Sequence, residues 1–280
     1  MTKRIAWLGL GLIGLPMASR LAAAGWKVSG FDVNGERLKL AAARGITAAN
    51  SAATALEGAE LVFTSMPNEK VFVDVLSALH ANAIVIDTST VGPDASRKVA
   101  PSINAYLRAP ISGSVGHAEG GQLTTFVSGP RTAYDAALPA LKAYSRAQFW
   151  VGEGEEARYA KLAINLMVAV TCGMMKEALA LGTKGGISWE KMLELMGESV
   201  VASPVVKYKL DPVRRHDYTP TATTSLVLKD VDLMVAAANA QGIELPLAAE
   251  MQKIFRRAVE QGLAERDFFS AVEPNSGSGR

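Results

Sequence analysis

The stretch I-A-W-L-G-L-G-L-I-G-L, from Ile5 to Leu15, decides the fold, because a short apolar strand runs directly into three glycines. Gly9 permits a tight exit from the strand, Gly11 lets the backbone approach a pyrophosphate, and Gly14 lets the next helix pack closely against a sheet. That helix, expected over residues 13–24, offers free N–H groups and the positive end of its dipole. The stretch therefore predicts a dinucleotide-binding turn.

The segment after this turn completes a βαβ unit. Gly25 fits the position that ends the first helix, and residues 26–31 read as a second short strand that ends at Asp32. An acidic residue ~20 positions after the glycines is placed to bind the ribose hydroxyls of the adenosine. Asp32 would repel a 2′-phosphate and so favours NAD, whereas nearby Arg37 leaves NADP open.

Length and composition set bounds on the class of protein. The 280 residues suit two domains, and a net charge of +2 with 20% charged residues demands neither a nucleic-acid nor a membrane partner. A single cysteine, Cys172, excludes an internal disulfide framework and fits a reducing compartment. The apolar run Leu162–Met175 is shorter than the roughly 20 residues of a membrane span, and no signal peptide is apparent. We therefore expect a soluble, cytoplasmic protein.

Strand-like runs alternate with helical segments in the first half of the chain, which is typical of a doubly wound parallel sheet. Polar residues follow two of these runs, at residues 65–68 and 87–90, where ligands bind to such sheets. Ordinary turns, or capping of the next helix by Ser89 or Thr90, explain them equally well. The expected strands are Arg4–Leu8, Lys27–Phe31, Leu61–Ser65, Ile84–Asp87, Tyr106–Arg108 and Thr124–Val127.

The pattern changes from Glu155 onward, where strands stop and a long apolar helix extends to about Lys184. A helix that is apolar over much of its circumference is expected to be buried, in part against another subunit. Three more helices are expected at Trp189–Glu198, Leu226–Gln241 and Leu247–Gln261. We predict a dinucleotide-binding domain over residues 1–154, an all-helical domain for substrate binding and oligomerisation over 155–273, and a disordered tail over 274–280.

Three groups of residues suggest chemistry. Lys161 and Asn165 lie one helical turn apart, and a protonated lysine can protonate the alkoxide that forms when hydride adds to a carbonyl. The turn at residues 112–114 offers a hydroxyl and N–H groups that can hold a carboxylate. Lys229 and Asp230 form either an exposed pair or a lysine directed at the cofactor. A solvated lysine, an ordinary buried amide and an unoccupied Ser-Gly turn are the alternatives.

Together the motifs resemble the β-hydroxyacid dehydrogenase family, of which 3-hydroxyisobutyrate dehydrogenase is a member, over essentially the whole chain. The resemblance implies a Rossmann domain, a helical domain, and a homodimer or homotetramer joined through the long helix. The motifs that carry it are G-L-G-L-I-G-L-P-M-A at Gly9–Ala18, Met66-Pro67, D-T-S-T at Asp87–Thr90, A-P-I-S-G at Ala109–Gly113, Lys161 with Asn165, and Lys229-Asp230.

The resemblance also implies roles for individual residues. Lys161 matches the catalytic acid/base, Asn165 matches the amide that orients the substrate, and Ser112 with Gly113 matches the site that binds the substrate carboxylate. We expect Ser114 and His117 to complete that site, and we expect no metal ligands. The expected cofactor site comprises Gly9, Leu10, Gly11, Leu12, Ile13, Gly14, Asp32, Met66, Pro67, Thr90 and Lys229.

Four positions depart from the family pattern and bear on the substrate. Arg108 replaces an aspartate before Ala-Pro, Ser114 and His117 replace glycines, and Ile164 replaces the first of two asparagines. These changes leave catalysis in place but prevent the naming of one substrate. His117 is equally well explained as an ordinary loop residue.

The leading hypothesis is a dehydrogenase that transfers hydride between NAD and a small β-hydroxy acid or its semialdehyde. An NADPH-dependent imine reductase is the first alternative, and Asp32 together with a retained Lys161 argues against it. A non-catalytic dinucleotide-binding protein is the second alternative, since a nuclear chromatin-associated relative keeps the fold but lacks the lysine. The retained Lys161 argues against that reading as well.

Overall fold

The computed structural model describes residues 4–273, so the predicted tail over 274–280 lies outside the described residues. The chain forms two compact units that meet within one long helix, the first extending to Lys161 and the second beginning at Leu162. The boundary between folding domains that the sequence places after residue 154 stays a prediction.

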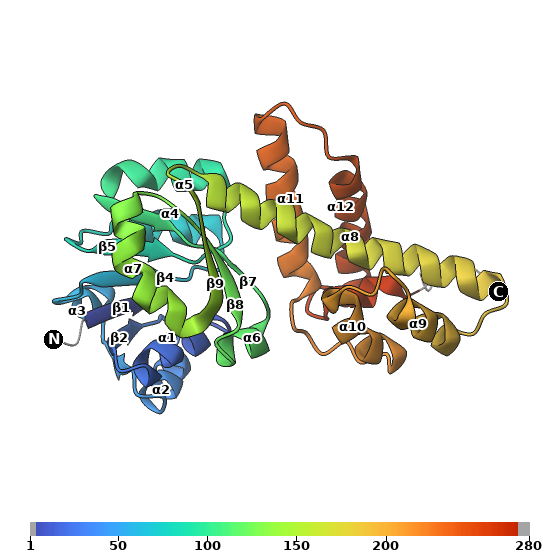
Figure 1. Ribbon diagram of the computed structural model, residues 1–280, viewed down its shortest axis with the longest axis horizontal. Helices are drawn as coiled ribbons and strands as arrows, with labels where there is room; N and C mark the ends of the chain where they lie inside the picture. Colours follow the sequence, from blue (N-terminus) through green and yellow to red (C-terminus); the bar gives the residue numbers. More distant parts are fainter. Residues whose placement is uncertain (1–3, 274–280) are drawn as a thin grey trace. The chain divides into compact units, whose positions relative to one another are not determined.

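The first unit is built on a nine-stranded sheet with the order β3-β2-β1-β4-β5-β6-β8-β7, in which β9 pairs with β8 (Figure 1). The strands β1 to β6 are parallel, which confirms the predicted doubly wound arrangement. The strands are β1 (Arg4–Leu8), β2 (Lys27–Phe31), β3 (Thr47–Ala48), β4 (Leu61–Thr64), β5 (Ile84–Asp87), β6 (Ala105–Arg108), β7 (Ile111–Ser112), β8 (Leu123–Ser128) and β9 (Ser145–Gly152).

The sheet is mixed at one edge, where β8 runs antiparallel to β6 and β7. The connection from β7 to β8 contains only one short helix, and a parallel crossover needs a dozen or more residues. The sequence pattern therefore predicted the parallel part of the sheet but not this reversal. It also missed β3, β7 and β9, two of which are two-residue strands with no periodic signal.

Helices cover both faces of the sheet, because alternate residues of each strand point to opposite faces. Ile5 and Trp7 join a buried cluster with residues of α1 and α7, whereas Ala6 and Leu8 join a second cluster with α3, α4 and α5. The helices are α1 (Gly14–Ala23), α2 (Gly35–Ala42), α3 (Ala52–Leu56), α4 (Glu69–Ser77), α5 (Pro93–Val99), the 3₁₀ turn η1 (Ala100–Ser102), α6 (Val115–Glu119) and α7 (Arg131–Tyr144).

The second unit is helical (Figure 1), and the predicted long helix and the three predicted shorter helices all match its helices closely. One helix, α10, was missed, although Ser203 accepts a hydrogen bond from the Val206 N–H and Pro204 occupies its first turn. Pro212 inside this helix hid the periodic pattern. The elements are α8 (Glu156–Lys184), α9 (Trp189–Glu198), α10 (Pro204–Arg214), α11 (Thr224–Ala240), α12 (Pro246–Ala258), the π-helical turn η2 (Val259–Leu263) and the 3₁₀ turn η3 (Phe268–Val272).

The length argument against a membrane span needs correction. The apolar run is only part of α8, which has 29 residues and an 18-residue window with mean hydropathy 1.4, enough by length and composition for a span. The core helix of a globular unit passes the same test, and 39% of that window is buried inside the protein. Leu162, Cys172 and Leu179 are among its buried side chains.

The rest of α8 faces outward and carries large apolar side chains. Met167, Met174 and Leu181 are 67%, 57% and 78% exposed. The predicted dimer or tetramer through α8 stays a prediction.

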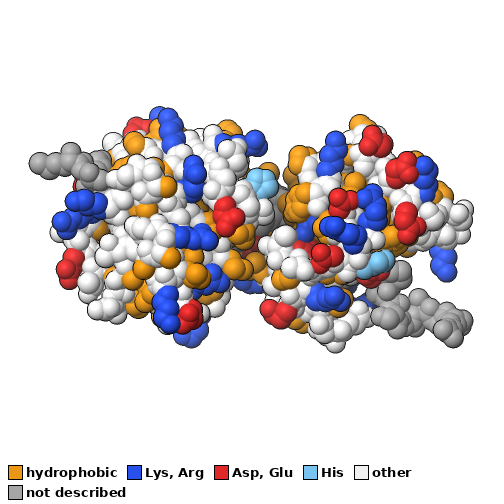
Figure 2. Space-filling model, turned by 90° about the horizontal axis from the view of Figure 1, so that it is seen from below, with side chains coloured by type: hydrophobic (Ala, Val, Ile, Leu, Met, Phe, Trp, Pro, Cys, Tyr) orange, Lys and Arg blue, Asp and Glu red, His pale blue; other side chains and the backbone are white. Residues whose placement is uncertain are grey.

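On the face of the molecule drawn in Figure 2, acidic and basic side chains are interspersed.

A buried ion pair fixes the end of the described chain in the second unit. Lys209 Nζ lies 2.7 Å from both carboxylate oxygens of Asp267, which also accepts the Thr221 N–H and hydroxyl. Burial raises the pKa of Asp267, but Lys209 and Thr221 outweigh it and hold the pKa below its ordinary value. The charged pair therefore ties α10 to the start of η3.

Candidate functional site

The glycine turn after β1 has the shape that a dinucleotide requires. Gly9 has a φ of 92°, and a Cβ there would lie 2.3 Å from the Ser65 carbonyl oxygen. A Cβ on Gly14 would lie 2.2 Å from the Gly9 oxygen, whereas a Cβ on Gly11 would meet nothing within 4 Å. Packing thus demands two of the glycines, and the third leaves the backbone open on the side where a pyrophosphate would lie.

Asp32 lies at the carboxyl end of β2 and is fixed by two backbone hydrogen bonds. Its Oδ2 accepts the Leu10 N–H at 2.7 Å, and its Oδ1 accepts the Asn34 N–H at 2.8 Å. The carboxylate is therefore held against the glycine turn, next to the point where the strand order reverses between β1 and β4. These residues fit an adenine dinucleotide. Leu10 is buried, Leu12 is exposed and Ile13 is half-buried beside the turn.

The loops after β4 and β5 are joined by side-chain hydrogen bonds. Ser89 Oγ accepts the Met66 N–H at 2.8 Å and donates to Asp87 Oδ1 at 2.6 Å. Thr64 Oγ1 donates to the same carboxylate oxygen at 2.6 Å. The buried carboxylate thus holds two of the predicted cofactor loops in one arrangement. The half-buried Thr90 follows directly.

The helix-capping alternative for this loop is wrong. The residue that precedes α5 is Gly92, with Pro93 in the first turn, so neither Ser89 nor Thr90 caps it. The loop after β4 does contain a helix cap, which was not predicted, because Asn68 accepts the Val71 N–H at the start of α4. The exposed Pro67 directly precedes that cap.

Arg158 is a residue of this region that sequence reasoning missed. It lies on the first turn of α8, is 1% exposed, and places Nη2 2.5 Å from Asp87 Oδ2 and 2.9 Å from the Tyr106 hydroxyl. Its Nη1 donates to the Ser89 carbonyl oxygen at 2.7 Å. The helix turn that precedes Lys161 is thereby anchored to the carboxyl end of β5. The signal in the sequence was Asp87 at the end of an apolar strand, because a buried carboxylate is normally paired with a cation.

The electrostatics of this cluster favour the charged form of Arg158. Burial lowers the pKa of Arg158, but Tyr106 and Asp87 outweigh it and raise the pKa overall. Burial also raises the pKa of Tyr106 to about 12, so its hydroxyl stays protonated at neutral pH. The phenol can therefore act as a hydrogen-bond donor as well as an acceptor.

The departure at Arg108 has a structural explanation. Its guanidinium donates to Glu155 Oε1 from Nη2 at 2.6 Å and from Nε at 3.0 Å, and both side chains are buried. The guanidinium also stacks 4.4 Å from the centroid of the Tyr106 ring. Arg108 thus connects β6 to the residue that precedes α8.

The predicted substrate loop follows β7. Ser112 is half-buried, and Gly113 has a φ of 135° at which a Cβ would lie 2.7 Å from Leu123. Ser114 precedes α6, and its Oγ lies 2.8 Å from Nδ1 of the exposed His117. These two departures from the family pattern therefore bind each other across the start of a helix. Their roles as substrate contacts stay predictions.

A second group of predicted residues lies on α8 and α11. Asn165 Nδ2 donates to Asp230 Oδ2 at 2.9 Å, and Lys229 Nζ lies 3.1 Å from Asp230 Oδ1. The sequence predicted a pair between Lys229 and Asp230. It did not predict the hydrogen bond from the Asn165 amide to Asp230. Lys161 is half-buried one turn before Asn165 on α8, and the intervening Ile164 is 39% exposed.

The fold and these residues define an NAD(P)-binding protein of the Rossmann type. The model of the NAD-binding domain of 6-phosphogluconate dehydrogenase matches residues 4–152. The model described as the NAD-binding region of NADP-dependent 3-hydroxyisobutyrate dehydrogenase matches residues 155–274. The chain belongs to the β-hydroxyacid dehydrogenase family.

Similar proteins match along nearly the whole chain. The NAD-dependent L-serine dehydrogenase of Pseudomonas aeruginosa is 31% identical, with 95% of each chain covered. The 3-hydroxyisobutyrate dehydrogenase of the same organism is 31% identical, with 90% of each chain covered. A structure of Mycobacterium tuberculosis 3-hydroxyisobutyrate dehydrogenase with L-serine has a TM-score of 0.86 at 28% identity, covering 97% and 98% of the two chains. An imine reductase from Pseudomonas sp., at 23% identity, 97% and 98% coverage and a TM-score of 0.65, shares the fold alone.

Proposed function

We propose that this protein is an NAD-dependent dehydrogenase of a small β-hydroxy acid, or of the matching semialdehyde in reverse, with Lys161 as general acid/base. The observation that carries the proposal is that Lys161 precedes Asn165 by one turn of α8, and that Asp230 accepts a hydrogen bond from the Asn165 amide. Hydride transfer to or from a carbonyl carbon needs one proton to move at the oxygen, and a lysine can supply or accept it.

In the oxidative direction, neutral Lys161 accepts the proton of the substrate hydroxyl while the hydrogen on the same carbon leaves as hydride. A nicotinamide cofactor, when bound, would supply the carbon that accepts the hydride. In the reductive direction, the Lys161 ammonium returns a proton to the oxygen as the C–H bond forms. Because Asp230 accepts an Asn165 N–H, the amide oxygen has a fixed direction, and we assign it the orientation of the substrate hydroxyl.

The substrate we propose is a 3-hydroxypropanoate substituted at carbon 2. L-serine and 3-hydroxyisobutyrate, named in two relatives, both carry a primary alcohol on the carbon next to the one that bears the carboxylate. We assign the carboxylate to the Ser112 hydroxyl and the backbone N–H groups beside Gly113, where no side chain intervenes. Ser114 and His117 then shape this loop by binding each other.

NAD is the cofactor that we propose for turnover. The Leu10 and Asn34 N–H groups hold the Asp32 carboxylate in place. Moving this carboxylate away from the 2′-phosphate of NADP would break both hydrogen bonds. Two negative charges ~4 Å apart repel by ~1 kcal/mol even in water and by more near a protein surface.

The test is turnover by the purified chain against a substrate panel, followed through the absorbance of NADH and NADPH. The panel holds 3-hydroxyisobutyrate, L-serine, 3-hydroxypropanoate, their semialdehydes, and cyclic imines. We expect the C2-substituted hydroxy acids to be oxidised with NAD. Turnover of imines alone, with NADPH, would replace the proposal with an imine reductase.

A further inference from the structure

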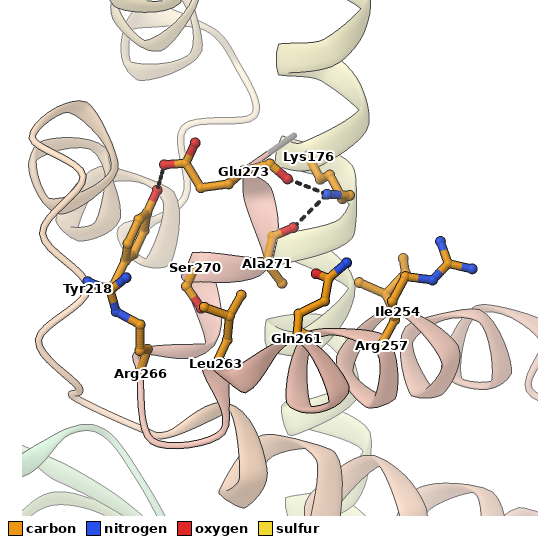
Figure 3. Close-up of a pocket in the computed structure, with 11 residues that line it drawn as sticks. Lys176, Tyr218, Ile254, Arg257, Gln261, Leu263, Arg266, Ser270, Ala271 and Glu273 are labelled. Carbon is orange, nitrogen blue, oxygen red and sulfur yellow. Dashed lines mark hydrogen bonds between the residues drawn. The ribbon is translucent and has the colours of Figure 1, made fainter. Parts of the chain in front are cut away.

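A cavity of about 230 Å³ lies within the helical unit (Figure 3). Lys176 of α8, Arg257 of α12 and the segment from Leu263 to Glu273 line it. Lys176 is about four turns of α8 beyond Lys161, and the cavity contains none of the residues assigned above to cofactor or substrate. It needs an explanation of its own.

One polar group in the wall of this cavity is buried without a partner. Ser270 is 2% exposed, and its Oγ has no hydrogen-bond partner among residues 4–273. Buried hydroxyls are nearly always hydrogen-bonded. Rotation of the Ser270 side chain about χ1 would turn this hydroxyl toward the cavity, where a ligand atom would bind it. Figure 3 shows Ser270 and Gln261 beneath the Lys176 ammonium around the same space.

Positive charge predominates around the cavity. Lys176, Arg257 and Arg266 line it together with a single carboxylate, that of Glu273. Lys176 Nζ donates to the backbone oxygens of Ala271 at 2.8 Å and Glu273 at 2.6 Å, which are neutral acceptors. Burial lowers the pKa of Lys176, and the charge of Arg257 lowers it further, although Cys172 and Glu273 act in the opposite sense. An anion placed between the two cations would relieve their repulsion.

The single carboxylate is already occupied. The Tyr218 hydroxyl donates to Glu273 Oε1, and His216 Nδ1 lies 2.6 Å from the same oxygen. These contacts leave the carboxylate with its one negative charge, which faces three cationic side chains around the cavity. Apolar atoms of Ile254, Ala258 and Leu263 complete the wall and would exclude water from a short hydrocarbon group.

We propose that this cavity is a binding site for a small organic carboxylate. The carboxylate lies between Lys176 and Arg257, the hydrocarbon part contacts Ile254 and Leu263, and Ser270 Oγ donates a hydrogen bond to the ligand. The volume is below the ~300–1,000 Å³ typical of pockets for larger ligands, which limits the ligand to a short-chain acid. The site is separate from the one proposed to carry out hydride transfer.

Isothermal titration of the full-length protein with isobutyrate tests the proposal, with isobutyramide as the neutral isostere and inorganic phosphate as a second anion. We expect isobutyrate to bind more tightly than either. Arg257→Gln should weaken isobutyrate binding about tenfold or more, because it removes a charged hydrogen-bond donor. Ser270→Ala should also weaken it.

The matched control is Arg256→Gln, which makes the same change at the neighbouring residue. Arg256 does not line the cavity, and its Nη2 lies 3.4 Å from Asp232 Oδ1. Isobutyrate that occupies only the hydride-transfer site would bind both arginine variants equally, and that result would overturn the proposal. Phosphate binding as tight as isobutyrate binding would overturn the assignment to an organic acid. Turnover is measured separately through NADH, so failure here leaves the proposed function unaffected.

Discussion

Replacing Arg158 with methionine should destabilise the first unit strongly while preserving much of the side chain's volume. The change removes the partner of Asp87, which is fully buried, and one donor each to the Ser89 oxygen and the Tyr106 hydroxyl. Breaking a buried ion pair by removing one partner costs about 3–5 kcal/mol. Against a total stability of ~5–15 kcal/mol, that loss should be conspicuous.

Equilibrium unfolding in urea, followed by tryptophan fluorescence, measures this effect. Trp7 is fully buried and stacks 4.9 Å from Phe63 in the core of the first unit, so its emission reports on that unit. The double variant Asp87→Asn/Arg158→Met should be less destabilised than the sum of the single changes, with a coupling energy of about 1–3 kcal/mol.

The matched control is Lys70→Met, which breaks an exposed pair with Asp74 and should leave the unfolding curve unchanged. Wild-type stability in Arg158→Met would show that the buried Arg158–Asp87 pair does not stabilise the first unit. Strict additivity in the double variant would show that the cation and the carboxylate are not energetically coupled.

Two further predictions concern cofactor choice and the helical unit. Asp32→Asn should lower the ratio of kcat/KM for NAD over NADP at least about tenfold by removing the repelling charge, and an unchanged ratio would contradict the assigned role. Asp267→Asn should cost about 3–5 kcal/mol at neutral pH, because Lys209 would stay buried without its counter-charge. The folded pKa of Asp267 is lowered, so its stabilising effect is present above the unfolded pKa and is lost as pH falls through the folded pKa. Urea unfolding across acidic pH should therefore show a weaker pH dependence in this variant than in the wild type.

The parallel part of the sheet could be predicted because its determinants are local. The glycine turn, the strand alternation and the acidic residue after β2 each carry a signal within a few residues, and Gly9 and Asp32 lie as that signal requires. The reversal at β8 and the short strand β7 depend on pairing between segments, which no local pattern records.

The polar network could not be predicted for the same reason. Arg158 and Asp87 are 71 residues apart, and Asn165 and Asp230 are 65 apart, so only the fold brings them together. Arg108 was identified as a departure from the family pattern, but its partner Glu155 emerged only from the structure.

The proposed role of Lys161 is tested by the rate of NAD reduction by Lys161→Ala with the best hydroxy acid of the panel. We expect turnover to be abolished while NADH binding, measured by fluorescence, is retained, because the lysine moves a proton and does not hold the cofactor. Lys184→Ala, at the exposed end of the same helix, should turn over normally. Unchanged turnover in Lys161→Ala would show that Lys161 is not the general acid/base.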